Sequence, residues 1–455
     1  MKSIIASLLT CLLWLAGPGF AAEKPNVIVI LADDLGYADV GFNGCKDIST
    51  PNIDSLAAHG VRCTNGYVSH PFCSPTRAGL ITGRYQQRFG HENNPAWLPE
   101  DSKVGLPLTQ VTLPQMLKDA GYVTGAIGKW HLGAAPCSHP NRRGFAEYFG
   151  FLGGGHMYLP NTKGGVEYTI PLSRNSESLE LQDYMTDVLS REAAAFIGRH
   201  KAKPFYLYVA YNAVHTPLQA PEKYLNRFPG IRDERRRTYA AMTSAMDDGV
   251  GCVLTALREH DLERNTLVFF FSDNGGPVPT VAPTSNEPLR GHKGAVFEGG
   301  IRVPFVVQWR GRLPEHTIYD EPVISLDVFP TAAALAGAKL PGDLRLDGVN
   351  IVPHLAGEAK QPPHPVLHWR TGGGATWAIR EGRYKLLQVA KDTAPQLYDL
   401  QNDIGESKDI APEKPELVAK LKQGHEAWNA ELVSPIFESP KAAPRKAKRE
   451  AAQKK

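Results

Sequence analysis

The sequence has little of what membrane proteins, zinc-binding domains and disulfide-rich scaffolds need. Only six of its 455 residues are cysteine, and no spacing between them forms a zinc-binding pattern. Beyond the N-terminal segment, no apolar run approaches the roughly 20 residues that span a bilayer. The sequence also has no Asn-x-Ser/Thr sequon, which favours a bacterial exported protein over a glycosylated lumenal one. We therefore expect no stable membrane insertion and no small disulfide framework.

The N-terminus has the layout of a secretory leader. Lys2 precedes an apolar run from Ile4 to Ala16, and a small-residue cleavage site follows around Ala21 and Ala22. This pattern predicts a signal peptide over residues 1–22 and a mature protein in a periplasm or in the medium. In such an oxidising compartment the cysteines outside the leader and the motif described below could pair in three ways. These are Cys45, Cys63, Cys137 and Cys252.

Charge is distributed unevenly along the chain. The net charge is +3, but the last seventeen residues, from Ser439, carry +6, so the remainder carries −3. This tail is rich in alanine, lysine and proline, which predicts a solvated, disordered extension over residues 437–455. We expect no nucleic-acid partner, and the composition does not indicate an oligomeric state.

Four apolar, β-prone runs, each followed at once by polar residues, predict buried parallel strands. They are Val27–Leu31, Tyr122–Ile127, Phe205–Ala210 and Leu267–Phe271. Helical patterns lie between them, such as residues 113–120 and 183–198. This alternation predicts an α/β fold, a large and mostly parallel sheet sandwiched by helices.

Past residue 355 the pattern changes to short alternating strands followed by a helix. The predicted strands cover residues 366–369, 376–380, 384–389 and 396–400, and the helix covers residues 415–430. We therefore predict a large α/β domain over residues 23–355 and a C-terminal α+β subdomain over residues 356–436, with a small antiparallel sheet.

Polar residues follow each of the four predicted strands of the large domain. Because ligands bind at the carboxyl ends of parallel strands, we expect these residues to share one site. They are Asp33 and Asp34, Gly128 to His131, Asn212 to His215, and Ser272 to Gly275. Each group alone is compatible with an ordinary turn or a surface histidine, but the four together predict a site. Long Pro/Gly-rich loops at residues 153–171 and 277–291 are expected above it.

A twelve-residue run, CSPTRAGLITGR, begins at Cys73. Pro75 suits the first turn of a helix, and Arg77 would lie one turn from Cys73. Free backbone N–H groups and a guanidinium would then face one point, which suits a tetrahedral oxyanion and lowers the pKa of a thiol. The run therefore predicts a hydrolase of anionic esters, although a plain helix start would fit its first five residues.

The remaining site residues indicate a hard metal and an anionic substrate. Four residues offer oxygen ligands: Asp33, Asp34, Asp273 and Asn274. Oxygen ligands favour Ca²⁺ or Mg²⁺ over zinc, and we expect one such ion. Cations beside them suit a fully charged tetrahedral group, and these are Arg77, Arg84, Lys129 and Lys293. No G-x-S-x-G elbow is present, and the carboxylates resemble metal ligands more than the opposed pair of a glycosidase.

The Cys73 run resembles the signature of the type I sulfatases, C-x-P-S-R followed by x-x-L-x-T-G-R, whose cysteine is oxidised to formylglycine. Only Thr76 departs, because the family usually has serine there. The resemblance extends from about Lys24 to Leu400. It includes PNVIVILADDLG at residues 25–36, GKWHLG at 128–133, FSDNGG at 271–276, RGHKG at 290–294 and AIREGRYKL at 378–386.

The resemblance implies an alkaline-phosphatase-like fold, a Ca²⁺ site and a sulfatase mechanism. Ca²⁺ would be held by Asp33, Asp34, Asp273, Asn274 and the modified Cys73. The sulfate oxygens would be neutralised by Arg77, Lys129 and Lys293, and protons would be moved by His131 and His215. A formylglycine-generating maturation enzyme would be a partner, because an unmodified Cys73 lacks the second hydroxyl that completes the reaction.

A sulfated carbohydrate is the expected substrate, but its sugar, its sulfated ring position and endo or exo action stay open. The residues expected to bind sugar lie in predicted loops and can stack or hydrogen-bond. They are Asn93, Asn94, Trp97, His156, Tyr158, Arg290, His368 and Arg370. Two alternatives remain: a phosphonate monoester or phosphodiester hydrolase of the same superfamily, and a non-catalytic sulfated-glycan binding protein.

Overall fold

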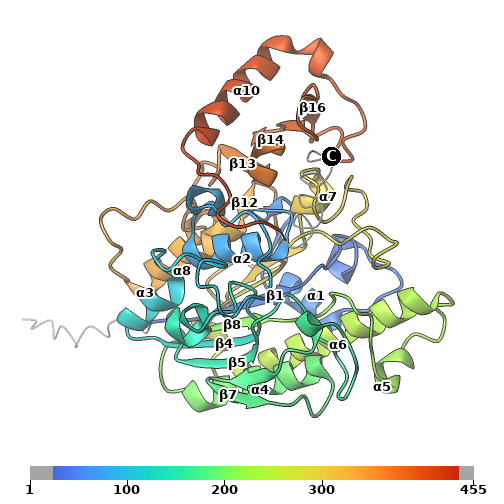
Figure 1. The fold of residues 1–455 in the computed structure, drawn as a ribbon, viewed down its shortest axis with the longest axis vertical. Coiled ribbons are helices and arrows are strands. Elements are labelled where there is room, and N and C mark those ends of the chain that lie inside the picture. Colours follow the sequence, from blue (N-terminus) through green and yellow to red (C-terminus); the bar gives the residue numbers. More distant parts are fainter. Residues whose placement is uncertain (1–23, 440–455) are drawn as a thin grey trace, which may run out of the picture.

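A computed structural model describes residues 24–439, so the predicted leader and all but the first residues of the predicted tail lie outside the described part. A ten-stranded sheet crosses the centre of the molecule (Figure 1). In spatial order its strands are β11 (Thr317–Tyr319), β2 (Val61–Cys63), β10 (Phe305–Gln308), β9 (Thr266–Ser272), β1 (Asn26–Ala32), β8 (Phe205–Ala210), β4 (Val123–Lys129), β5 (Glu147–Phe151), β6 (Leu172–Arg174) and β7 (Glu177–Leu179).

The four predicted strands are neighbours at the centre of this sheet. β9, β1, β8 and β4 run parallel to one another, and β5 continues the parallel part. β10 and β6 pair antiparallel at its two sides. The central strands are buried on both faces, which explains their continuous apolar sequences. The predicted α/β fold class is confirmed.

Helices cover both faces of the sheet because successive side chains of each strand point to opposite sides. Ile28 and Ile30 of β1 pack into one buried cluster, whereas Val27 and Val29 pack into the other. The first face is covered by α1 (Pro51–Ala58), α4 (Met185–His200), α5 (Glu222–Leu225) and α6 (Glu234–Glu259). The second is covered by α2 (Cys73–Thr82), α3 (Leu113–Asp119) and α8 (Val328–Ala336).

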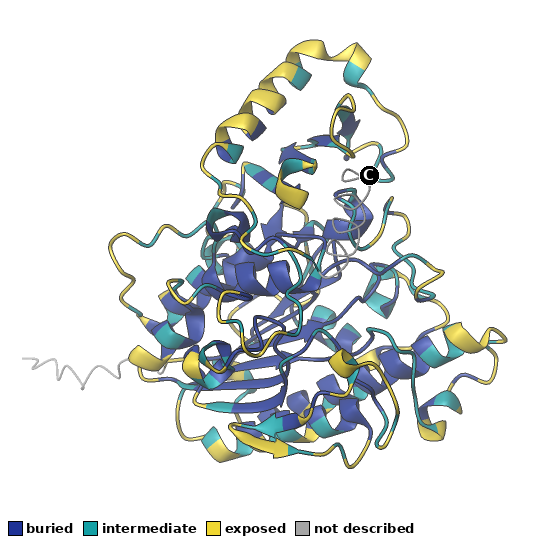
Figure 2. Cartoon of the chain, in the orientation of Figure 1, coloured by how far each residue is buried: buried dark blue, intermediate teal, exposed yellow. Residues whose placement is uncertain are grey.

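A small antiparallel sheet lies at one end of the molecule, beyond α2 (Figure 1). Its strands are β13 (Val366–Thr371), β14 (Thr376–Glu381), β15 (Tyr384–Gln388) and β16 (Gln396–Asp399). α10 (Pro415–Asn429) packs against it through Leu421, next to Ile379 and Leu386, and exposes its other face (Figure 2). These elements match the predicted ones. The proposed domain boundary at residues 355 and 356 lies between the short helix α9 (Val352–Leu355) and β13.

Buried charges attach the small sheet to the large domain. Lys385 of β15 donates to Glu298, the first residue of α7 (Glu298–Ile301), at 2.8 Å and forms an ion pair with Glu406 at 2.9 Å. All three side chains are shielded from solvent. A two-stranded sheet of β3 (Gly66–Tyr67) and β12 (Val323–Ile324) lies next to this junction.

The described residues include the two predicted long loops and five cysteines. Residues 153–171 contain a single 3-10 turn, Val166–Tyr168, and residues 277–291 contain no helix or strand, as expected for long loops. All five described cysteines are free, so the possible disulfides among four of them do not form in this structure. Within residues 24–439, the helices are too short or too polar to cross a bilayer.

Candidate active site

The parallel strands deliver their polar ends to one edge of the sheet. Asp33 and Asp34 follow β1, Asp273 follows β9, and Lys129 is the last residue of β4. Ligand atoms of these three aspartates and of Cys73 all lie within 4.8 Å of one another. The prediction that separate strand ends form one site is therefore reproduced by the fold.

Helix α2 places Cys73 at this edge. All ten residues of the helix are buried, and Cys73 is the first of them. The backbone N–H of Ser74 donates to Oδ1 of Asn94 at 3.0 Å, and the Ser74 hydroxyl donates to the carbonyl of His131 at 2.6 Å. The Thr76 hydroxyl donates to the carbonyl of His70 at 2.6 Å, so threonine supplies the hydroxyl that serine would supply.

Three carboxylates and three cations balance one another around Cys73. Lys129 Nζ lies 2.5 Å from Asp33, and Lys293 Nζ lies 2.6 Å from Asp34 and 3.1 Å from Cys73 Sγ. Two nitrogens of Arg77 donate to Asp273, at 2.7 and 3.0 Å. These three ion pairs are largely closed to solvent, which makes their attraction strong and each partner necessary.

The cluster shifts the pKa values of its members. Burial and the nearby Asp273 raise the pKa of the Cys73 thiol to about 12, so burial outweighs the lowering that the helix N-terminus and cations predicted. Burial also disfavours charge on Asp33, but Lys129 and the other cations outweigh it and hold the pKa of Asp33 below its usual range. Burial, with the charge of Asp33, raises the pKa of Asp273 to about 6.

The oxygen atoms of the cluster fit a hard divalent cation. Asp33, Asp34 and Asp273 offer carboxylates, and Asn274 donates its amide N–H to Asp34 at 2.7 Å. The carbonyl oxygen Oδ1 of Asn274 is buried and has no hydrogen-bond partner. A buried carbonyl oxygen without a hydrogen-bond partner, together with three carboxylates, provides the oxygen ligands that Ca²⁺ or Mg²⁺ binds.

Two histidines stand at separate positions in the same pocket, which has a volume of about 300 Å³. His215 Nε2 lies 3.7 Å from Asp34, and its Nδ1 contacts the carbonyl of Thr216. His131 Nδ1 is buried and unpartnered. Burial lowers the pKa of both imidazoles, so neutral rings face the pocket.

The backbone is strained at two of these positions. Asp34 and His131 have φ values of 63° and 58°, in the left-handed region that costs a non-glycine residue roughly 1 kcal/mol or more. Each lies two residues beyond the end of a sheet strand, Asp34 after β1 and His131 after β4. Strain held in place by surrounding structure is typical of functional sites.

The structure divides the predicted sugar-binding residues. Asn94 lines the pocket with Cys73, whereas His156 lies in a neighbouring cavity and contacts two backbone carbonyls. Arg290 donates to the Glu406 carbonyl at 2.7 Å, and Arg370 donates to Glu92 at 2.7 Å. Arg290, Arg370 and His368 do not line the Cys73 pocket.

His368 stacks on Trp428, with ring centroids 4.7 Å apart. Arg84 also points elsewhere, because its guanidinium donates to Gln110 at 2.9 Å. Sequence reasoning missed Glu167 and Tyr168, which lie in a predicted loop and line the pocket. An exposed acid and a tyrosine in a loop carry no local sequence signal for such a position.

Comparisons with known proteins show which family this chain resembles. The family model described as "Sulfatase" matches residues 25–338, and a model described as "N-sulphoglucosamine sulphohydrolase, C-terminal" matches residues 292–430. The chain is 38% identical over 392 residues to arylsulfatase J of Mus musculus, covering 80% of this chain and 64% of that protein. It is 34% identical to N-acetylgalactosamine-6-sulfatase of Canis lupus familiaris, covering 81% and 72%.

A solved structure described as "Ps i-CgsB in complex with k-i-k-neocarrahexaose" has the same fold. Its TM-score is 0.86 at 42% sequence identity, and the match covers 91% of this chain and 94% of that one. The likeness therefore includes both the large domain and the small C-terminal sheet.

Proposed function

This chain belongs to the sulfatase family, and we propose that it removes sulfate from a sulfated carbohydrate through a formylglycine made from Cys73 and one bound Ca²⁺ ion. As a member of that family it is a sulfuric ester hydrolase. The observation that carries the proposal is the position of Cys73, a buried thiol among three carboxylates, two lysines and Arg77. Because burial raises the pKa of this thiol to about 12, an unmodified Cys73 would not be a thiolate nucleophile at neutral pH.

The metal would be held by the oxygens of Asp33, Asp34, Asp273 and Asn274, together with residue 73. The unpaired Asn274 carbonyl oxygen supports this assignment. A bound Ca²⁺, or Mg²⁺ in its place, would supply positive charge for the sulfate and for an attacking hydroxyl. The hydrated aldehyde of residue 73 would supply that hydroxyl.

The chain's own residues would bind the sulfate and move protons. Lys293 lines the pocket beside Cys73 and would hold a sulfate oxygen, with Lys129 behind it. His215 would donate a proton to the oxygen of the departing alcohol when the S–O ester bond breaks, and His131 would accept a proton when sulfate is released. Arg77, which donates to Asp273, would act by orienting that carboxylate.

The carbohydrate substrate is supported by the relatives. One relative is an N-acetylgalactosamine-6-sulfatase, and one similar structure contains a neocarrahexaose. Export, the leader and the maturation enzyme are further parts of the proposal, and N-terminal sequencing of the secreted protein would test the cleavage near Ala22.

Mass spectrometry of the peptide that carries residue 73 tests the mechanism. Protein from the native host should carry formylglycine there, and Cys73→Ala should release sulfate from neither 4-nitrophenyl sulfate nor sulfated mono- and disaccharides. Cys45→Ala is the matched control, because Cys45 is a free cysteine outside the active-site pocket and should leave activity intact. A free thiol at residue 73 in fully active protein would contradict the proposal.

The same assay separates the phosphodiesterase alternative. The wild-type protein should hydrolyse 4-nitrophenyl sulfate and a sulfated sugar faster than bis(4-nitrophenyl) phosphate. A faster phosphodiester reaction would favour the alternative, because charge alone does not distinguish the two monoanions.

A further inference from the structure

A groove runs along β5, next to the active-site pocket. Leu152 follows the carboxyl end of β5 and Ala146 precedes its first residue, and both line one cavity of about 850 Å³. At about 3.3 Å per strand residue these two positions lie roughly 20 Å apart. The groove therefore extends along the whole strand, far enough for several groups of an extended ligand.

A narrow junction connects the groove with the active-site pocket. The junction shares Pro95 and His131 with that pocket, and it shares Trp97 and Leu152 with the groove. Trp97 is partly exposed and thus offers an aromatic surface at the point where the two spaces meet. The junction itself has a volume of only about 20 Å³, so a ligand chain that reaches the groove from the active-site pocket would lie over the partly exposed face of Trp97 rather than pass through the junction.

The groove carries positive charge without a balancing negative charge. Lys118 and Arg142 both line it and are exposed, and neither side chain forms a hydrogen bond or ion pair with another described residue. Among the described residues that line the groove there is no aspartate or glutamate. Glu167 lines the junction, where it disfavours a second anionic group close to the reacting one, and Glu180 lines a neighbouring cavity that shares Ser178 with the groove.

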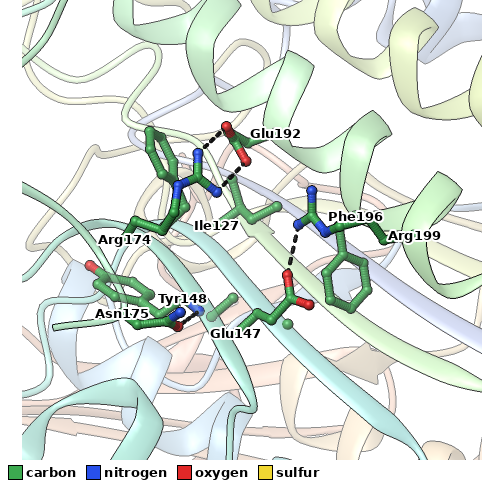
Figure 3. Close-up of a pocket in the computed structure, with 11 residues that line it drawn as sticks. Ile127, Glu147, Tyr148, Arg174, Asn175, Glu192, Phe196 and Arg199 are labelled. Atoms are coloured by element: carbon green, nitrogen blue, oxygen red, sulfur yellow. Dashed lines mark hydrogen bonds and ion pairs between the residues drawn. The ribbon is translucent and has the colours of Figure 1, made fainter. Parts of the chain in front are cut away.

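A second cavity near β5 contrasts with the groove because its charges are paired (Figure 3). This cavity, of about 270 Å³, is lined by Phe196 and other residues on the α4 side of the sheet. Its two arginines are neutralised, because Arg174 pairs with Glu192 and Arg199 pairs with Glu147. It therefore offers no attraction to an anion.

We propose that the groove binds the continuing chain of a sulfated glycan whose reacting sulfate lies beside Cys73. Trp97 contacts the sugar next to the reacting one, and Lys118 and Arg142 bind a second anionic group farther along the chain. This inference rests on the proposed function and deepens it: the substrate is an oligomer or polymer, and sulfates inside the chain are accessible.

Calorimetric binding of two sugars of different length tests the groove. Neocarrabiose and neocarrahexaose are titrated into the full chain carrying Cys73→Ala, so that no turnover occurs. The hexaose should bind about tenfold more tightly than the biose, since charge complementarity adds to its affinity. Adding Lys118→Ala and Arg142→Ala should remove about tenfold of the hexaose affinity and change the biose affinity less than about twofold. Trp97→Ala should weaken both.

The matched control is Lys201→Ala with Lys203→Ala, two exposed lysines after α4 that line none of these cavities. It should leave both affinities unchanged. The inference is overturned if the hexaose does not bind, if it binds no more tightly than the biose, or if the Lys118 and Arg142 changes weaken both sugars equally. Failure of the proposed function would be seen in a different measurement: wild-type protein that carries formylglycine would release no sulfate.

Discussion

At the scale of single residues, the main partner of the Arg77 side chain is the carboxylate of Asp273. Its guanidinium donates twice to that carboxylate and also to the Lys129 carbonyl and the Tyr208 hydroxyl. The side chain is closed to solvent. The ester-binding role that its spacing from Cys73 predicts is therefore indirect in this structure, and stability as well as activity depends on it.

We predict that Arg77→Ala lowers the free energy of unfolding by about 3–5 kcal/mol, because it leaves Asp273 buried and unpaired. It should also abolish sulfate release. Urea unfolding of the variant and of Arg191→Ala measures the effect. The Arg191–Asp183 pair is exposed, so its loss should cost less than about 1 kcal/mol. A loss below 1 kcal/mol for Arg77→Ala would show that Asp273 does not need this partner.

Asn94 provides a second test at this scale. Its side chain accepts the Ser74 backbone N–H next to Cys73, so Asn94→Ala should reduce kcat for a small sulfate ester and cost about 1 kcal/mol of stability. Asn43→Ala is the control, because Asn43 donates to the Tyr37 carbonyl and does not line the active-site pocket. If Asn94 only contacted sugar, its loss would raise KM for a glycan and leave hydrolysis of 4-nitrophenyl sulfate unchanged.

Single residues differ in how well their positions can be predicted from the sequence. That Asp33, Asp273 and Cys73 lie together could be predicted, because each follows a strand or belongs to a motif with fixed spacing. His368 and Arg370 could not be placed the same way. Long side chains in a polar segment can reach sugar or pack internally, and only the fold shows that His368 stacks on Trp428 and that Arg370 pairs with Glu92.

At the scale of elements, continuous apolar runs identified the central strands because those strands are buried on both faces. β1 was predicted within one residue at each end, and β8 at both ends. β5 and β10 were not predicted. β5 contains a glycine and a glutamate, and β10 has only four residues, so neither produces a strong periodic signal.

The junction between α7 and β15 gives a prediction about elements. Lys385 neutralises Glu298, which begins α7 directly after the loop that carries Lys293. Lys385→Met should leave the buried Glu406 without its cation and Glu298 with Arg302 alone, lower the free energy of unfolding by about 3–5 kcal/mol and reduce sulfate release through displacement of that loop. Urea unfolding and a sulfate assay measure both effects.

Lys420→Met is the matched control, because Lys420 pairs with Glu381 on the surface of α10. Its effect on stability should stay below about 1 kcal/mol. If Lys385→Met were equally mild, the small sheet would not support the Lys293 loop through this ion pair.

At the scale of the whole molecule, buried histidines make stability depend on pH. Burial lowers the pKa of His70 and His368 to about 3 and that of His91 and His425 to about 4. The unfolded chain binds protons at these histidines below about pH 6.5, whereas the folded chain does not. Their contribution to stability is complete above pH 6.5 and falls as the pH is lowered toward 4. Buried carboxyls oppose this, because burial raises the pKa of Asp247 to about 6.

A single histidine isolates the effect from those opposing carboxyls. His425 lies flat on Trp377, with ring centroids 4.1 Å apart, so His425→Phe keeps the aromatic contact and removes the titrating group. Between pH 7.5 and pH 5.0 the wild-type protein should lose roughly 2 kcal/mol more stability than this variant, since each pH unit below 6.5 costs about 1.4 kcal/mol per neutral histidine. Urea unfolding at the two pH values measures the difference, with His354→Phe at a solvent-accessible position as control. An equal pH dependence in wild type and His425→Phe would mean that the buried ring takes up its proton without unfolding, and the acid sensitivity of the fold would then have to come from its ion pairs, such as Lys385 with Glu298.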